Sequence, residues 1–197
     1  MDAKTYATIT EACARLAGRL SDDVLGTVRE HYAAGEWYLA GSALLGNLAY
    51  QGVGITREEQ GLIRSFLDED DIPDLLDVPV VAEEPPLAYR FRPTGPVDAP
   101  SPYRADSLLT THAAREGAQG LHRAWRDPLD GAPDGAAWLY VLRVAEDTDE
   151  LKTFSGLTAV LWTDLSEKWP IEVVAEATAL TPYQAAALAA AQAVWNA

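Results

Sequence analysis

The stretch DEDDIPDLLDVPVVAEEPP, residues 68–86, decides how the chain is organised. Between Ser65 and Tyr89 lie eight carboxylates and no Lys or Arg. The stretch also carries four prolines, which remove backbone amide donors and disfavour α conformation in the residues before them. Because a long helix cannot run through it, we predict an acidic, proline-rich hinge over residues 71–86.

Residues 1–70 carry the pattern of a small helical bundle. Apolar residues at spacings of three and four form one stripe on the first helix: Tyr6, Ile9, Cys13, Leu16 and Leu20. Further helices are expected over residues 21–35, over residues 36–50, and after Thr56, which is spaced to form a capping box with Glu59. Four helices with short connections favour antiparallel packing.

Beyond the hinge the pattern changes to short strands. Residues 87–92 alternate as a strand with one polar face. The segment AAWLYVLRVAED, residues 136–147, is apolar on both faces, which is typical of a central strand. A third strand is expected over residues 171–177, with Glu172 and Glu176 on its polar side.

Helical patterns follow each of these strands. The first runs from about residue 106 to residue 125, where two glycines are potential breaks, and the second lies around residues 157–169. The last helix has strong start signals, because Thr181 suits the N-cap, Pro182 the first position and Gln184 the capping box.

The order of these elements predicts the α+β class with two domains. A helical bundle over residues 1–70 is followed, after the hinge at 71–86, by an α/β domain over residues 87–197. Its alternating strands and helices favour a three-stranded parallel or mixed sheet covered by helices.

The composition is that of a folded, acidic protein. An apolar fraction of 48% in 197 residues, with six Trp, is ample for a core. No run of about 18 apolar residues and no signal-peptide pattern is present, so we expect no membrane association and a cytoplasmic location. A lone Cys13 cannot form an internal disulfide, which agrees with a reducing compartment.

The net charge of −15 limits the partners that the chain can bind. It repels phosphate backbones, so nucleic acid is not expected as a partner, whereas a basic protein partner complements the charge. Oligomeric state is not determined by these patterns.

Common catalytic and metal motifs are missing. Gly52 and Gly54 begin like a dinucleotide fingerprint, but they follow a helical pattern and Arg57 stands where the third Gly belongs. No serine lies in a GxSxG elbow, and the acidic run lacks the Gly and the bidentate Glu of a calcium loop. His112 and His122 are too far apart to ligate one ion. We therefore expect no metal, no cofactor and no covalent catalytic residue.

Residues 87–126 contain six arginines and only three acids, so this stretch is a basic island in an acidic chain. Its candidate anion-binding residues are Arg90, Arg92, Arg104, Arg115, Arg123, Arg126, His112 and His122. Arginines recognise carboxylates and phosphates through paired donors, so a cleft here suits an anionic small molecule. The other interpretation is internal pairing with Glu172, Glu176 and the acidic hinge.

The favoured hypothesis is a non-enzymatic interaction protein, an acidic inhibitor or immunity-type protein that masks a basic partner. Its candidate partner-binding carboxylates are Asp68, Glu69, Asp70, Asp71, Asp74 and Asp77. Opposite charges speed association between such partners. The alternative is a small-molecule-binding protein or enzyme that acts on an anionic ligand through an Arg-rich cleft, and a structural role in a larger assembly is the third hypothesis.

Several short motifs give the chain a diffuse resemblance. They are Val24, Leu25, Arg29, Gly35-Glu36-Trp37, Leu44-Leu45 and residues 56–59, followed by Pro182-Tyr183-Gln184, Ala186-Ala187 and Trp195. In their order they resemble a loose group of uncharacterised proteins from high-GC actinobacteria. This resemblance implies a two-part cytoplasmic protein and brings no activity with it.

Overall fold

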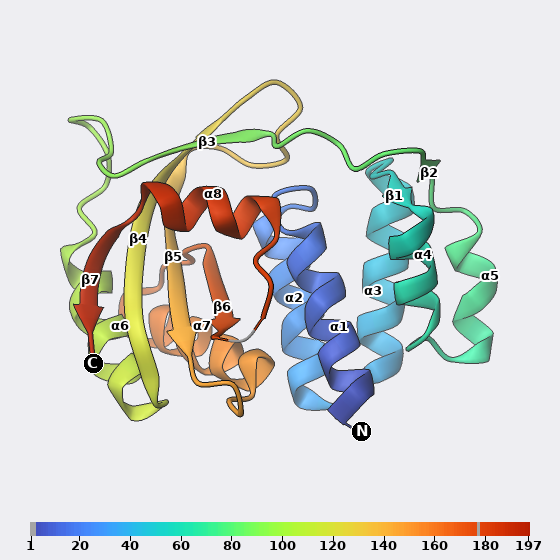
Figure 1. Ribbon diagram of the computed structural model, residues 1–197, viewed down its shortest axis with the longest axis horizontal. Helices are drawn as coiled ribbons and strands as arrows, with labels where there is room; N and C mark the ends of the chain where they lie inside the picture. The colour runs from blue at the N-terminus through green and yellow to red at the C-terminus, as the bar shows by residue number, and fades with distance from the viewer. Residues whose placement is uncertain (1–2, 177) are drawn as a thin grey trace. The chain divides into compact units, whose positions relative to one another are not determined.

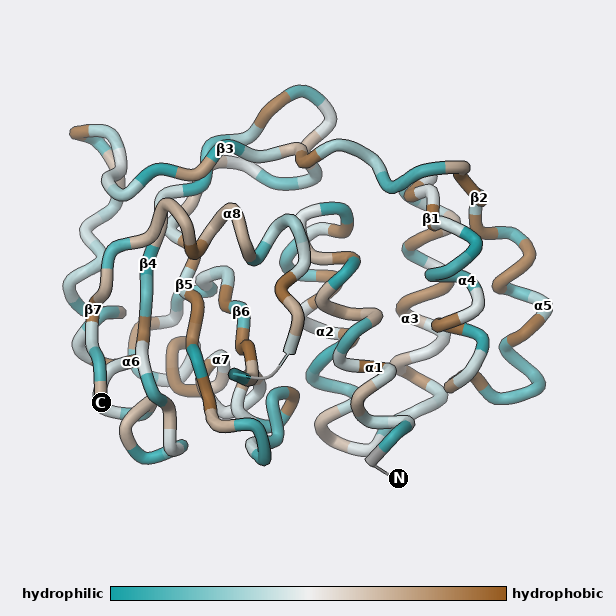
Figure 2. Tube along the Cα trace, in the orientation of Figure 1, coloured by the Kyte–Doolittle hydropathy of each residue, from teal (hydrophilic) through white to brown (hydrophobic). Residues whose placement is uncertain are grey.

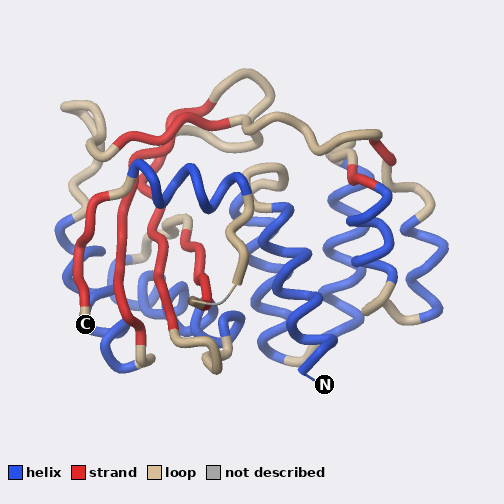
Figure 3. Tube along the Cα trace, viewed as in Figure 1, coloured by secondary structure: helices blue, strands red, loops and turns tan. Residues whose placement is uncertain are grey.

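The computed structural model describes residues 3–176 and 178–197, with helices and a mixed sheet, which confirms the α+β class (Figure 3). The chain divides into two compact units, Met1–Leu87 and Ala88–Ala197.

The first unit is mainly helical (Figure 1). Its elements are α1 (Ala3–Leu16), α2 (Asp22–Ala34), α3 (Trp37–Tyr50), β1 (Ile55–Thr56), α4 (Arg57–Arg64), η1 (Glu69–Asp71), α5 (Ile72–Leu75) and β2 (Val80–Val81). The expected apolar stripe of α1 is buried at Ile9, Cys13 and Leu16. Leu44 and Leu48 of α3 are buried as well. Burying these side chains drives the helices together.

The ends of these helices follow their start and stop signals. Gly35 closes α2 in a left-handed conformation with φ 76°, which glycine adopts without steric cost. The capping box of Thr56 and Glu59 at the start of α4 is confirmed. Ser21 stands at the N-cap of α2, although its side chain forms no capping hydrogen bond there.

The acidic stretch contains short regular elements. Residues 69–75 form η1 and α5, and β2 pairs in parallel with β1, Ile55 lying opposite Val80. Leu75 and Val78 are buried. This part of the stretch is therefore packed against the helices of the first unit, while residues 82–86 are exposed and have no regular structure.

The second unit is built on a mixed sheet. Its elements are β3 (Tyr89–Arg92), α6 (Tyr103–Arg115), β4 (Ala118–Pro128), β5 (Ala137–Val144), α7 (Glu150–Leu165), β6 (Ile171–Ala175), α8 (Pro182–Ala190) and β7 (Gln192–Asn196). The strand order is β3-β4-β5-β6, with β7 also paired to β4. Because β3 pairs with residues 125–128 and β7 with residues 120–123, these two short strands share one edge of β4.

The segment expected to be the central strand, β5, lies inside the sheet. It pairs antiparallel with β4 and parallel with β6. Trp138, Tyr140 and Leu142 of β5 join one core cluster with residues of β4, α6 and α7, and their neighbours along the strand face the opposite side. Helices α6 and α7 lie behind the sheet in Figure 1, and α8 crosses its front.

Two expectations for this unit differ from the structure. The helix expected to continue to residue 125 ends at Arg115, and Gly117, at φ 70°, leads into strand β4. Residues 118–126 pair with β5, so sheet pairing overrides the local helical spacing of Leu121, Ala124 and Trp125. A short fifth strand, β7, follows the last helix, so the sheet has five strands where three were expected.

The third strand also differs from its expected polarity. Every residue of β6 is buried, including Glu172, which was expected on a polar face. The Gln184 side chain donates a hydrogen bond of 2.9 Å to Glu172 Oε2, which supplies a polar partner inside the unit. Ala177, the end of the expected strand, lies outside the described residues.

The capping box of α8 gives the first testable prediction. Thr181 Oγ1 accepts a hydrogen bond from the Gln184 amide, and the Gln184 side chain accepts one from the Thr181 amide. Thr181→Ala removes one of these acceptors and is expected to lower the free energy of unfolding by about 0.5–2 kcal/mol, measured by urea denaturation. The control, Thr163→Ala on an exposed position of α7, is expected to leave the curve unchanged. Equal unfolding curves for the two variants would show that the capping box does not stabilise the protein.

Candidate functional site

The acidic segment, defined as Asp68, Glu69, Asp70, Asp71, Asp74 and Asp77, lies on η1, α5 and the residues beside them. Five of these carboxylates are exposed, and only Asp71 is buried, with 5% of its surface accessible. Figure 2 shows the connection between α4 and α5 as strongly hydrophilic. Among the described residues, none forms an ion pair with Asp68, Asp70 or Asp74. Like charges are therefore concentrated in this segment, and in the described part of the chain these three carboxylates have no cationic partner.

Asp71 anchors this segment against α3. A Cβ atom added to Gly41 of α3 would lie 2.9 Å from Asp71 Oδ2 and 3.3 Å from Leu67. The missing side chain of Gly41 leaves room for this approach, and a larger residue would force Asp71 to shift. Burial raises the pKa of the Asp71 carboxyl, and the neighbouring Asp68, Asp74 and Asp70 raise it further. The ionised carboxylate of Asp71 thus destabilises the folded state.

Asp71→Asn is expected to raise stability at neutral pH, because it removes the buried charge and keeps the shape. A carboxyl whose pKa is raised by folding binds its proton more tightly in the folded state. Its protonation therefore contributes fully to folding stability below the ordinary carboxyl pKa. That contribution is lost as pH rises through the raised pKa. The difference in unfolding free energy between Asp71→Asn and the native chain should therefore vanish in acid and grow toward neutral pH.

The matched control is Asp70→Asn, which neutralises an exposed neighbour on the same turn. Denaturant unfolding of the three proteins at several pH values checks the prediction. An Asp71→Asn variant less stable than the native chain at pH 7 would mean that the carboxylate is stabilised by its surroundings.

Three of the six arginines of the basic island form ion pairs inside the second unit. Arg92 Nε lies 2.6 Å from Asp127 Oδ2, and Arg123 pairs with Asp106. Arg126 lies 4.0 Å from Asp134. The internal pairing expected for the arginines thus occurs, but with aspartates. Glu172 bonds to Gln184 and Glu176 to Arg143, so the two glutamates named from the sequence have other partners.

Arg126 is almost fully buried on the α8 side of the sheet. Its Nη1 donates to the Tyr183 hydroxyl at 2.9 Å, and its guanidinium stands 4.4 Å from the centre of the Tyr89 ring. This is a cation–π arrangement, which favours a cation among aromatic rings. Arg126 therefore ties β4 to β3 and α8.

Arg123 lies on the opposite face, because it is separated from Arg126 by three positions in an unbroken strand register. It packs over the Trp138 ring at 4.6 Å, and its partner Asp106 also accepts a 2.8 Å hydrogen bond from the Tyr140 hydroxyl. Burial and this hydrogen bond raise the pKa of Tyr140. Two of the six arginines consequently extend to different sides of the sheet and do not converge on one ligand.

The remaining residues of the island are spread over several elements. Arg90 is exposed on β3, and Arg104 and Arg115 are exposed at opposite ends of α6. His112 on α6 and His122 on β4 are half-buried. Burial and the nearby Arg143 lower the pKa of His122, which favours its neutral form.

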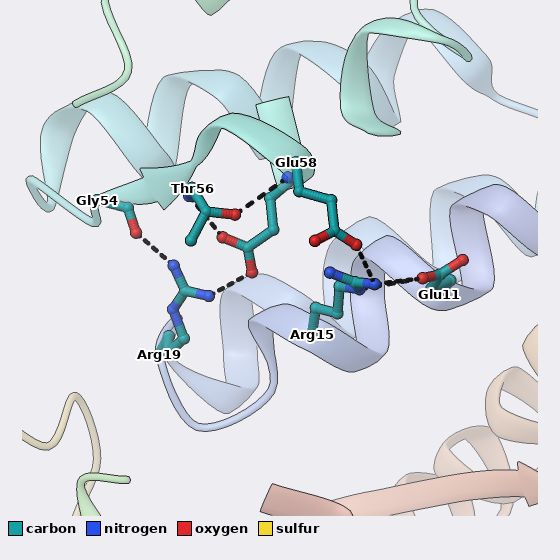
Figure 4. Close-up of polar contacts among 7 residues, drawn as sticks. Glu11, Arg15, Arg19, Gly54, Thr56 and Glu58 are labelled. Carbon is teal, nitrogen blue, oxygen red and sulfur yellow. Dashed lines mark hydrogen bonds and ion pairs between the residues drawn. The ribbon is translucent and has the colours of Figure 1, made fainter. Parts of the chain in front are cut away.

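A second polar cluster lies in the first unit and was not foreseen from the sequence (Figure 4). Arg19, after α1, lies 2.5 Å from Glu59 Oε1 and donates to the backbone oxygen of Gly54. Glu59 in turn accepts the Thr56 amide, as the capping box requires. These contacts join the α1–α2 connection to β1 and α4. They hold β1, the partner of the strand that follows the acidic segment.

Beside it, Arg15 bridges Glu11 and Glu58, with both contacts at 2.8 Å. This pair of contacts is more exposed than the Arg19–Glu59 pair, since 31% of the Arg15 side chain is accessible against 11% for Arg19. Exposed pairs are screened by water and contribute less to stability.

Residues 3–176 and 178–197 contain no group of three or more His, Cys, Asp or Glu side chains arranged to hold a metal ion. No helix in the same ranges combines the length and apolar character needed to cross a bilayer.

Most of the residues that bind the arginines of the basic island were not predicted as their partners from the sequence. Asp106, at the start of the helix expected from the sequence, contacts Arg123 and Tyr140, which lie opposite each other on β4 and β5. Tyr89 and Tyr183, the partners of Arg126, are 94 positions apart, and no local spacing connects them. Alternation along residues 118–126 would have shown that Arg123 and Arg126 face opposite sides, once the segment was read as a strand.

Comparison with known proteins identifies no relative. No protein-family model matches the chain, no curated protein matches it, and no solved structure matches it.

Proposed function

We propose that the chain is a non-enzymatic interaction protein that binds a basic protein surface through the acidic segment. The proposal rests on one observation, the exposure of five carboxylates on a short stretch that carries no base. Like charges repel one another, and the neighbouring carboxylates add to the effect of burial in raising the pKa of Asp71. A cationic partner would offset this repulsion.

The distribution of the arginines supports the same proposal. Arg92, Arg123 and Arg126 are engaged within their own unit, and two of them extend to opposite faces of the sheet. An anion-binding cleft would need several arginines directed at one point. The acidic surface of the first unit is therefore the better candidate for recognition. An inhibitor or immunity-type protein that covers a basic partner fits this chemistry.

The test combines affinity capture from the native host with charge reversal. The variant carries Lys at positions 68, 70 and 74, which are exposed; Asp71 is left intact because a buried Lys would unfold the segment. We expect near-native stability and an association rate with the captured protein that falls at least about tenfold at low salt, with a weaker salt dependence.

The control reverses three exposed acids of the second unit, Asp98, Asp130 and Glu146, and so changes the net charge equally. Equal loss in both variants would assign the effect to net charge and refute a localised surface. A loss of stability in the first variant that becomes smaller in added salt would instead indicate that the carboxylates form stabilising interactions within the protein. Unchanged stability and association would leave the segment as a solubilising stretch and refute the proposal.

A further inference from the structure

Large apolar side chains are exposed at the start of α3, beside the acidic segment. Tyr38 is 65% exposed, and Trp37 and Leu39 before and after it are also exposed. Aromatic residues are enriched where binding energy is concentrated at protein interfaces. Successive side chains of an α-helix are turned by about 100°, so Trp37 and Tyr38 lie toward the side of α3 that carries Gly41, whereas Leu39 points to the other side.

Two sets of contacts place this helix end next to the acidic segment. Gly41, one helical turn after Tyr38, is the residue against which Asp71 packs. The Trp37 ring lies 5.7 Å from the ring of Tyr32, and Tyr32 lies 5.9 Å from Phe66, just before the segment. Burial raises the pKa of Tyr32, and Asp71 and Asp68 are among the charges that add to the shift, so these carboxylates lie near the same ring.

We infer that Trp37 and Tyr38, together with Asp68 and Asp70, form one docking surface for a basic amphipathic segment of a partner protein. The inference rests on the proposed function and specifies its partner. Charge complementarity selects the occupant: the carboxylates require Lys or Arg, and the exposed rings of Trp37 and Tyr38 require an apolar side chain beside that cation. A second copy of the chain, with net charge −15, would bring carboxylates against carboxylates.

The probe is a labelled peptide of about 14 residues with Lys and Leu at helical spacing, and its companion has Ser in place of each Leu. Fluorescence anisotropy measures the Kd of each peptide for the full chain. Tyr38→Ala is expected to raise the Kd of the Lys/Leu peptide about tenfold and to leave that of the Lys/Ser peptide within about twofold. Asp70→Asn is expected to weaken both peptides by the same factor.

Tyr50 provides the matched control, because it is a tyrosine on the same helix, 91% exposed and at the opposite end. Tyr50→Ala is expected to leave both Kd values unchanged. Thermal melting verifies that each variant is folded, and Leu39→Ser, on the other side of the same helix turn, is a further control that is expected to leave both Kd values unchanged.

Equal effects of Tyr38→Ala and Tyr50→Ala, or equal affinity for the two peptides, would overturn the inference. If charge reversal at positions 68, 70 and 74 still slows binding of the captured protein in that case, the proposed function stands without this surface. If charge reversal has no effect, both fail. Self-association of the chain that Tyr38→Ala abolishes would assign the surface to a second copy and also overturn the inference.

Discussion

Arg19→Met is expected to lower the free energy of unfolding by roughly 3–5 kcal/mol, the usual cost of leaving one charge of a buried pair without its partner. Glu59 is buried and keeps its capping bond to the Thr56 amide, so its carboxylate cannot move out to water without breaking the start of α4. The backbone oxygen of Gly54 loses a donor at the same time. Guanidinium chloride unfolding of the full chain measures the change.

The control for this variant lies one turn earlier on the chain. Arg15→Met removes the same kind of side chain from a more exposed pair, and its expected cost is about 0.2–1 kcal/mol. A double variant, Arg19→Met with Glu59→Gln, should recover part of the loss, because the uncompensated charge is gone. Similar costs for Arg15→Met and Arg19→Met would show that burial does not strengthen the Arg19–Glu59 pair.

Leu142→Ala is expected to cost about 2–5 kcal/mol, since it leaves a cavity in the core of the second unit. Leu142 is fully buried on β5, between two paired strands, where neighbours cannot easily close the space. Arg143→Ala is the neighbouring control, because that side chain is exposed and its contact with Glu176 is long, at 3.7 Å. A cost below about 1 kcal/mol for Leu142→Ala would show that Leu142 is not part of the core of the unit.

These two variants separate what local patterns reveal from what they do not. Leu142 belongs to a segment whose unbroken apolar character marks it as an internal strand, because a strand covered on both faces has no polar side. The importance of Arg19 depends on Glu59, 40 positions away, and becomes visible only when the α1–α2 connection meets β1 and α4.

The sequence by itself determined the features that arise from neighbouring residues. Helix periodicity in the first unit, the capping boxes at Thr56 and Thr181, and the apolar strand β5 all rest on interactions between residues a few positions apart. The position of the acidic segment and its lack of bases are likewise properties of the chain order.

Tertiary structure decided the rest, because pairing and burial join residues that are distant in the chain. Strand β4 has helical spacing of its apolar residues, and it becomes a strand because β3, β5 and β7 supply hydrogen-bond partners along both its edges. The six carboxylates of the acidic segment are alike in the sequence, yet packing against Gly41 buries Asp71 and leaves the others in solvent. Only the fold brings α3 next to that segment, since Gly41 of α3 lies against Asp71.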